Sequence, residues 1–229
     1  MSDIIVKCEN LTIGYGGLTI ISGFNLEIFR GDYLIITGEN GSGKTTLICG
    51  LLGLLPIRKG SIKFENGFGK SNIGYLPQSP PTARDFPASV MEVVLSGTLT
   101  RGHFYPFYRK TDKKAAIKSL DNLGILSLKD KCFRELSLGQ KKKVLLSRAL
   151  LSGNGMLVLD EPVSGLDSES TEEFYNIIAS LNKEQGTTII MVTHDNKTAK
   201  SYANRELVIG MKSTIFSDNY IEKKEVINV

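Results

Sequence analysis

The chain has 229 residues, of which 41% are hydrophobic and 23% are charged, and its formal net charge is +4. This balance excludes an intrinsically disordered chain, and the length allows one large domain or two smaller lobes. The mild positive charge is spread along the chain, so we expect an ordinary solvated surface, with attraction to an anionic membrane face or to nucleic acid as the less favoured interpretation.

The cysteines and the apolar stretches bear on the cellular setting. The three cysteines, Cys8, Cys49 and Cys132, lie far apart and in no metal-ligand spacing. An odd number without paired spacing favours a reducing compartment over a disulfide framework. The amino-terminal sequence MSDIIVKCEN has no basic segment leading into an apolar one, so we expect no secretory signal. The longest strongly apolar stretch, residues 47–57, is about half the ~20 residues that a membrane span needs, so we expect a chain that does not itself cross a bilayer.

Apolar runs typical of strands occur at residues 33–37, 73–76, 156–159, 188–193 and, more weakly, 206–209. Several of them are continuous, as in strands covered on both faces, so we predict a mostly parallel sheet flanked by helices. Between residues 82 and 151 the pattern changes to helical spacing, at residues 89–95, 112–123 and 139–151. We predict a single domain, residues 1–229, in which a helical subdomain over residues 82–151 is inserted into an α/β core formed by residues 1–81 and 152–229.

A phosphate-loop pattern, G-x-x-x-x-G-K-[ST], follows the first of these strands in the sequence GENGSGKTT. Glycines let backbone amides turn toward phosphate groups, and the helix that follows offers its positive amino-terminal end. Lys44 supplies a charge, and Thr45 offers a hydroxyl to Mg²⁺. The order of strand, loop and apolar helix argues against a chance glycine-rich turn. We predict a phosphate-binding site formed by Gly38, Glu39, Asn40, Gly41, Ser42, Gly43, Lys44, Thr45 and Thr46.

A second strand ends in two adjacent carboxylates, in the sequence MLVLDEPVSGLD at residues 156–167. Adjacent side chains on a strand point in opposite directions, so Asp160 and Glu161 face different surroundings. A phosphate-loop NTPase uses a second strand to deliver an aspartate to the magnesium ion, and we assign that role to Asp160. Glu161 then points toward the water that attacks the γ-phosphate and acts as general base or orients that water. A strand-ending turn without chemistry is the alternative for this segment taken alone.

Three further segments complete a pattern: ELSLGQ at residues 135–140, SGLD at 164–167 and TTIIMVTHD at 187–195. Together with the phosphate loop and the LDEP strand end, they resemble the ATP-binding subunit of ABC transporters, in the family's order and over nearly the whole chain. The resemblance implies an α/β fold with a RecA-like phosphate-loop core, a mostly parallel sheet, an amino-terminal antiparallel β portion and the inserted helical subdomain. It also implies that the chain binds and hydrolyses ATP with Mg²⁺.

The resemblance assigns roles to further residues. Tyr15 resembles the aromatic residue that stacks on adenine, with a half-buried strand tyrosine as the alternative. Gln78 resembles the glutamine that contacts Mg²⁺ and the attacking water and that moves with the transmembrane partner. His194 resembles the histidine that hydrogen-bonds the γ-phosphate and steadies Glu161, although such a residue taken alone is more often a packed or capping histidine. His103 is interpreted as a surface or packing residue, with metal binding as the less favoured alternative because no partner ligand is nearby in the sequence.

The signature loop contains Ser137, Gly139 and Gln140, and in the family it faces the γ-phosphate held by a second subunit. A helix begins there, so its dipole favours the anion. The family has two glycines after the serine, whereas this chain has Leu138 and then Gly139, so the leucine side chain must point away from the nucleotide. Lysines at residues 141–143 follow; a run of this kind is mostly a solvated helix face, with a contribution to the potential at the phosphates as the alternative.

A dimer follows from this resemblance, because the signature loop of one copy completes the site of another. It implies two ATP molecules held between two copies of the chain, and Asp167 in SGLD resembles the residue that crosses this interface. The transmembrane part is then a separate permease, docked near Gln78 and residues 79–97. An extracytoplasmic solute-binding protein acts through it, no nucleic acid is involved, and the subunit is cytoplasmic on the inner face of the plasma membrane.

A weaker similarity bears on the transported solute. Residues 79–97, the loop before Lys110 and the EPVSGLD turn also resemble the ATPases of zinc and manganese importers. Three alternatives stay open. The first is an importer ATPase for an iron-siderophore or an organic solute. The second is a soluble ABC ATPase that works on chromosomes, repair or ribosomes. The third is a nucleotide-sensing module without turnover, which the presence of Glu161 and His194 disfavours.

Overall fold

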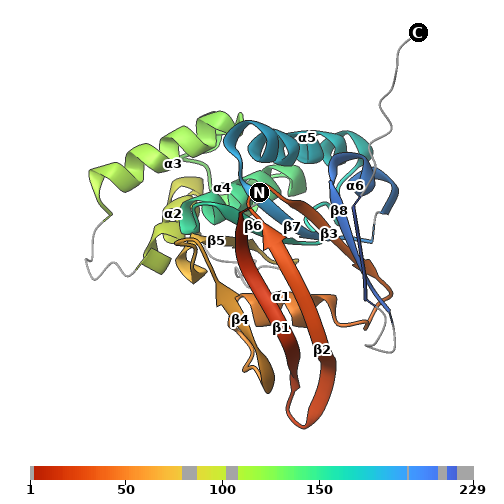
Figure 1. The fold of residues 1–229 in the computed structure, drawn as a ribbon. Helices are drawn as coiled ribbons and strands as arrows, with labels where there is room; N and C mark the ends of the chain where they lie inside the picture. Colours follow the sequence, from red (N-terminus) through yellow and green to blue (C-terminus); the bar gives the residue numbers. More distant parts are fainter. Residues whose placement is uncertain (1–2, 79–86, 102–107, 195, 211–215, 221–229) are drawn as a thin grey trace. The chain divides into compact units, whose positions relative to one another are not determined.

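The structure is a computed structural model, and it describes residues 3–78, 87–101, 108–194, 196–210 and 216–220 (Figure 1). The chain divides into two compact units, one formed by Met1–Lys70 with Asn182–Val229 and the other by Ser71–Leu181. Across the described residues, no helix is long and apolar enough to cross a membrane.

The first unit contains a three-stranded antiparallel sheet in the order β2-β1-β4. Its strands are β1 (Ile4–Tyr15), β2 (Leu18–Phe29) and β4 (Lys59–Phe64). Along β2, Phe24, Leu26 and Ile28 are buried at alternate positions, so one face of the sheet covers a core. Figure 1 shows β1 and β2 as two long neighbouring strands, and helix α1 (Lys44–Leu51) packs against both of them. The antiparallel portion that the resemblance implied is thereby confirmed.

Parallel strands form the second layer of the first unit. Strand β3 (Tyr33–Gly38) pairs in parallel with β7 (Thr188–Val192) on one side and with β8 (Arg205–Ile209) on the other, and β9 (Phe216–Tyr220) adds to β8 in the antiparallel sense. Every residue of β7 is buried, as a continuous apolar run predicts for a strand covered on both faces. Helix α6 (Asn196–Tyr202) connects β7 to β8 and contacts β3.

A series of hydrogen-bonded polar side chains supports the end of β3 just before the phosphate loop. The hydroxyl of Thr37 donates a 2.9 Å hydrogen bond to Glu206 Oε1, and Lys200 Nζ lies 2.8 Å from Glu206 Oε2. Glu206 is buried, and a buried carboxylate is tolerated where it is paired and hydrogen-bonded. These contacts tie β8 and α6 to the residue that precedes Gly38.

The second unit contains a parallel strand pair and most of the helices. Strands β5 (Ile73–Leu76) and β6 (Met156–Asp160) pair in parallel. The helical elements are α2 (Val90–Leu95), α3 (Lys110–Asn122), α4 (Leu138–Ser152) and α5 (Ser168–Gln185, whose last turn counts with the first unit), with 3-10 helices η1 (Lys70–Asn72), η2 (Ser96–Arg101), η3 (Leu126–Leu128) and η4 (Phe133–Glu135) at connections.

Three helices of this unit coincide with the segments of helical spacing in the sequence. Helix α4 contacts α2, α3 and β5, and between β5 and β6 the described residues form no strand. The second unit also contains β5, β6 and most of α5, so it is larger than the predicted insertion. The limits of the helical subdomain, residues 82–151, stay a prediction.

Candidate nucleotide site

Glycines shape the loop between β3 and α1. Gly38, Gly41 and Gly43 have φ angles of 141°, 80° and 103°, which residues with a side chain rarely adopt. At Gly43 there is also little space, since a Cβ would lie 3.0 Å from Ile20 Cγ2. The loop therefore turns tightly and places the amino-terminal end of α1 at its rim, where backbone N–H groups favour an anion.

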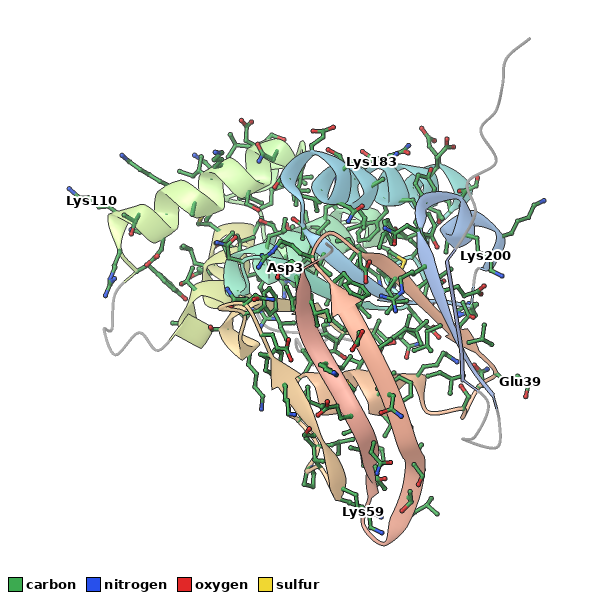
Figure 2. All side chains as sticks on the ribbon, viewed as in Figure 1. Asp3, Glu39, Lys59, Lys110, Lys183 and Lys200 are labelled. Carbon is green, nitrogen blue, oxygen red and sulfur yellow. The ribbon has the colours of Figure 1, made fainter. Side chains whose placement is uncertain are left out.

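Two polar side chains complete this loop. Lys44 is buried and its Nζ donates to the carbonyl oxygens of Gly38 at 2.8 Å and Glu39 at 2.9 Å, which holds the ammonium over the loop. The Ser42 hydroxyl is buried and makes no hydrogen bond to any described residue. Buried polar groups are normally bonded, so this hydroxyl is suited to a phosphate oxygen. Glu39 is exposed and its side chain projects outward beyond β3 (Figure 2), so its charge points away from the loop.

Tyr15 ends β1 beside helix α1, and 49% of its surface is exposed. Desolvation raises the pKa of Tyr15 and the neighbouring Cys49 thiol raises it further, whereas a hydrogen bond with Thr46 lowers it. Both neighbours belong to α1, which begins at the phosphate loop. The phenol is therefore anchored next to the loop while a large part of the residue stays accessible, as stacking on a base requires.

His194 follows β7 at the same edge as the phosphate loop. Strands β3 and β7 are parallel, with Ile36 opposite Val192, and Thr193 N donates to Ile36 O at 3.3 Å. The carboxyl ends of parallel strands meet at one edge of a sheet, so His194 and Gly38 lie at a common edge. His194 is exposed.

Asp160, Glu161 and Gln78 gather at the carboxyl ends of the strand pair in the second unit. Leu76 pairs with Leu159, so Gln78 and the two acids follow neighbouring strands at the same edge. Asp160 ends β6 and is buried, whereas Glu161 is half-buried and has a φ of 46°. That angle is rare for a residue other than glycine, and it turns the chain out of the strand. Gln78 Nε2 donates a 2.7 Å hydrogen bond to Glu161 Oε2.

The signature loop begins helix α4 with a capping box. The Ser137 hydroxyl oxygen accepts from Gln140 N at 3.2 Å, and Ser137 N donates to Gln140 Oε1 at 3.1 Å. Ser137 is exposed, and its hydroxyl accepts in this box, so the hydroxyl proton stays available for an anion. Leu138, the first residue of α4, is 46% exposed.

The lysines at residues 141–143 are not a solvated face, so that interpretation was wrong. Lys142 is buried, and Lys143 Nζ lies 2.5 Å from Glu173 Oε1 on α5. Burial lowers the pKa of Lys142, and the charge of Glu161 raises it in part. Residue 142 precedes buried Leu145, Leu146 and Ala149 by three, four and seven positions, which is the spacing of one helix face. That spacing in the sequence indicates that residue 142 lies on the buried face of the helix.

Asp167 caps the start of helix α5. Ser170 N donates to Asp167 Oδ1 at 2.8 Å, and Ser170 Oγ donates to Asp167 Oδ2 at 2.9 Å. These bonds hold the pKa of Asp167 below its usual value, and the bond from the backbone N–H of Ser170 has the larger effect. Sequence reasoning singled out Asp167 but not Ser170, its partner.

The structure gathers the predicted residues in two groups, one in each unit. Tyr15, the phosphate loop and His194 belong to the first unit, and Gln78, Asp160, Glu161, the signature loop and Asp167 belong to the second. The Thr45 hydroxyl and the Asp160 carboxylate are oxygen donors of the kind that Mg²⁺ prefers. No three His, Cys, Asp or Glu side chains in the described part of the chain are placed to hold a metal ion. His103 lies outside the described residues.

A glycine-rich loop after one parallel strand, and an Asp-Glu pair after another, define a phosphate-loop NTPase of class α/β. Comparison with known proteins gives the family. The ABC transporter family matches residues 21–164. A zinc transport system ATP-binding protein of Streptococcus pneumoniae is 34% identical over 206 residues, which cover 88% of this chain and 88% of that protein. The manganese transport system ATP-binding protein MntB of Bacillus subtilis is 32% identical over 217 residues, which cover 92% and 85%.

A solved structure agrees with these relatives. The chain aligns with cbiO1 of Clostridium perfringens, part of an ABC transporter complex, with a TM-score of 0.82 and 31% identity over 95% of this chain and 89% of that one. The chain belongs to the ABC transporter family, and it is an ATPase of that family. The α/β fold class and the ATP hydrolysis expected from the sequence are confirmed.

Proposed function

We propose that this protein is the ATP-hydrolysing subunit of an ABC transporter that imports a divalent metal cation, zinc or manganese, through a separate membrane permease. The observation that carries the proposal is the 2.7 Å hydrogen bond between Gln78 and Glu161, beside the buried Asp160, because it presents a held carboxylate where a hydrolytic base is needed. The substrate class is supported by the names of the relatives, which are zinc and manganese systems matched over most of their length.

Hydrolysis uses residues from both groups. The backbone amides of residues 38–46 and the ammonium of Lys44 hold the triphosphate. The Thr45 hydroxyl, the Asp160 carboxylate and Gln78 would hold Mg²⁺, which would neutralise charge on the phosphates when bound. Glu161 accepts the proton of the attacking water. His194 donates a hydrogen bond to the γ-phosphate, and Tyr15 stacks on adenine.

A second copy of the chain completes each site. Ser137, Gly139 and Gln140, at the start of α4, face the γ-phosphate held by the other copy, with the helix dipole favouring the anion. Asp167 lies at the interface between the copies. ATP then adds contacts that exist only in the closed dimer, and hydrolysis removes them, so nucleotide turnover drives closure and opening.

The partners are a membrane permease and, through it, an extracytoplasmic solute-binding protein. The permease docks near Gln78, so that its movement reaches Glu161 through their hydrogen bond. Residues 79–86 of the expected docking segment lie outside the described residues. The subunit works on the cytoplasmic, inner face of the plasma membrane, and it binds no nucleic acid.

Two measurements test this function. ATP turnover by the purified protein is compared with that of Lys44→Ala and of Lys59→Ala, a matched control whose lysine lies at the tip of the three-stranded sheet, away from the phosphate loop (Figure 2). Turnover should fall in the first variant only. Uptake of radioactive zinc and manganese is then measured in cells that lack the gene and in cells that carry either variant. Uptake that is equal in all strains contradicts the proposed transport role.

A further inference from the structure

Leu138 rests on the SGLD loop of the same subunit. It is the residue at which this chain departs from the double glycine of the signature loop, and it is 46% exposed. A Cβ built on Gly165 would lie 3.2 Å from Leu138 Cδ2, so the leucine side chain covers that glycine closely. Gly165 has a φ of 80°, so the loop needs a glycine there for its backbone as well.

Two consecutive turns connect that contact to Glu161. Ser164 N donates to Glu161 O at 3.2 Å, and Leu166 N donates to Val163 O at 3.1 Å. Gly165 therefore lies in the same short turn structure that begins at Glu161. If Leu138 displaces this loop, the backbone of Glu161 should move with it, because the two are joined by these turns.

A cavity lies beside the two residues that flank Leu138, Ser137 and Gly139. It has a volume of about 120 Å³ and separates the start of α4 from the start of α5, with Leu166 and Ser170 on the far side. Within the second unit, α4 and α5 also approach through Gly139 and Ser170, and through the Lys143 to Glu173 ion pair. Of these three contacts of α4, the one made by Leu138 is with a residue of the SGLD loop, Gly165.

We propose that Leu138 is a positioning residue that couples the signature loop to Glu161 of the same subunit. The inference rests on the proposed function, in which the signature loop contacts the ATP held by the other copy while Glu161 acts on the ATP of its own subunit. Leu138 then joins the two ATP sites of the dimer, because closure of the signature loop on one nucleotide presses on the loop that carries the base for the other.

The test compares three variants in ATP hydrolysis: Leu138→Ala, Leu138→Met and the control Leu54→Ala. Alanine favours helices at least as well as leucine, so the first variant shortens the side chain without weakening α4. Methionine keeps the volume and should restore the contact. Leu54 is 63% exposed and follows α1, which makes it a matched leucine outside the loop contact.

We expect Leu138→Ala to lower kcat by about 5-fold and to bring the Hill coefficient for ATP toward one, since mutations between coupled sites change coupling by roughly 2- to 30-fold. ATP binding to the phosphate loop, measured by calorimetry, and the melting temperature should stay as in the wild type. Leu138→Met and Leu54→Ala should keep both kcat and cooperativity.

Several results overturn this role. One is a kcat and a Hill coefficient in Leu138→Ala that equal those of the wild type. Another is an equal loss of kcat in Leu138→Met, and a third is a loss of kcat that is matched by a lower melting temperature. Failure of the proposed function is distinguishable, because the wild-type protein itself would then show no ATP turnover and no ATP-dependent dimer.

Discussion

The side-chain amide of Gln78 and the carboxylate of Glu161 share a 2.7 Å hydrogen bond although the two residues are 83 positions apart. Glu161 is held from two directions, by this bond at its side chain and by a left-handed backbone angle at its Cα. An amide donor fixes where the carboxylate oxygen points without occupying its second oxygen.

Replacing Glu161 by glutamine should abolish turnover while keeping ATP bound. The amide has the shape of the carboxylate but does not accept a proton, so we expect turnover to fall by about 10²- to 10⁴-fold. With ATP present, the variant should elute as a dimer from a sizing column. Glu184→Gln, an exposed glutamate on α5, is the control and should behave as the wild type. A monomeric elution position with bound ATP contradicts the sandwich arrangement.

Mixed dimers should recover activity from two inactive proteins. A Lys44→Ala subunit lacks the phosphate-loop cation, and a Ser137→Arg subunit has a blocked signature loop, so each should be inactive as a homodimer. Half of the dimers in an equal mixture are mixed, and each of these has one intact pocket out of two, which predicts up to about a quarter of wild-type turnover. The comparison is each protein alone at the same total concentration. Absence of any recovery argues against sites shared between copies.

Cys8 should resist thiol reagents in the folded protein. Burial raises the pKa of Cys8 to about 12, and the thiolate is the reactive form, so little of it exists near neutral pH. Cys49 and Cys132 are half-buried. We expect iodoacetamide to label Cys8 much more slowly than either of them, and all three to react in urea, as measured by mass spectrometry of peptides. Equal labelling in the folded state would show that β1 opens readily.

Asp167 should make stability depend on pH in the acidic range. Its folded pKa lies below the ordinary value of 3.8 because it accepts hydrogen bonds from Ser170. A lowered carboxyl pKa contributes stability that is present above the unfolded value and is lost as pH falls through the folded one. In urea unfolding, the advantage of the wild type over Asp167→Ala should be constant near neutral pH and should shrink as the pH falls below the unfolded value of 3.8.

Asparagine at residue 167 separates the cap from the charge. It keeps an acceptor for the amide of Ser170, because asparagine caps helices about as well as aspartate. We expect Asp167→Asn to retain most of the stability of the wild type near neutral pH. The stability difference between Asp167→Asn and Asp167→Ala should not change as the pH falls. A difference between wild type and Asp167→Ala that stays constant with pH would exclude the charge as its source.

Local patterns explain which elements the sequence predicted well. The runs at β3, β5, β6 and β7 are mostly apolar and almost wholly buried, so their positions could be predicted from the local sequence alone. The long strands β1 and β2 pair with several register shifts, among them one between Cys8 and Leu11, so alternation is limited to short stretches such as Phe24 to Ile28 and does not mark their full length. They were expected only through the family resemblance.

Charge patterns were a poorer guide than apolar patterns. Lys142 is buried because its place on the inner face of α4 outweighs its charge, and a helix that packs on several neighbours leaves little solvated surface. Ser170 carried no signal, since a serine in a polar stretch gains its meaning only from the residue that lies against it, and Gly165 was marked only as a member of the SGLD segment.

The sequence by itself determined the phosphate loop, the acid pair at the end of β6 and the capped start of α4. These depend on a few consecutive residues: glycines that allow positive φ angles, a lysine and a threonine at set positions, and a serine with a glutamine three residues later. Only the tertiary structure brought Gln78 to Glu161, Leu138 to Gly165 and Lys142 into the interior. Parallel pairing aligns the carboxyl ends of strands that are distant in the chain, and packing decides which side chain covers which loop, so neither can be read from neighbours in sequence.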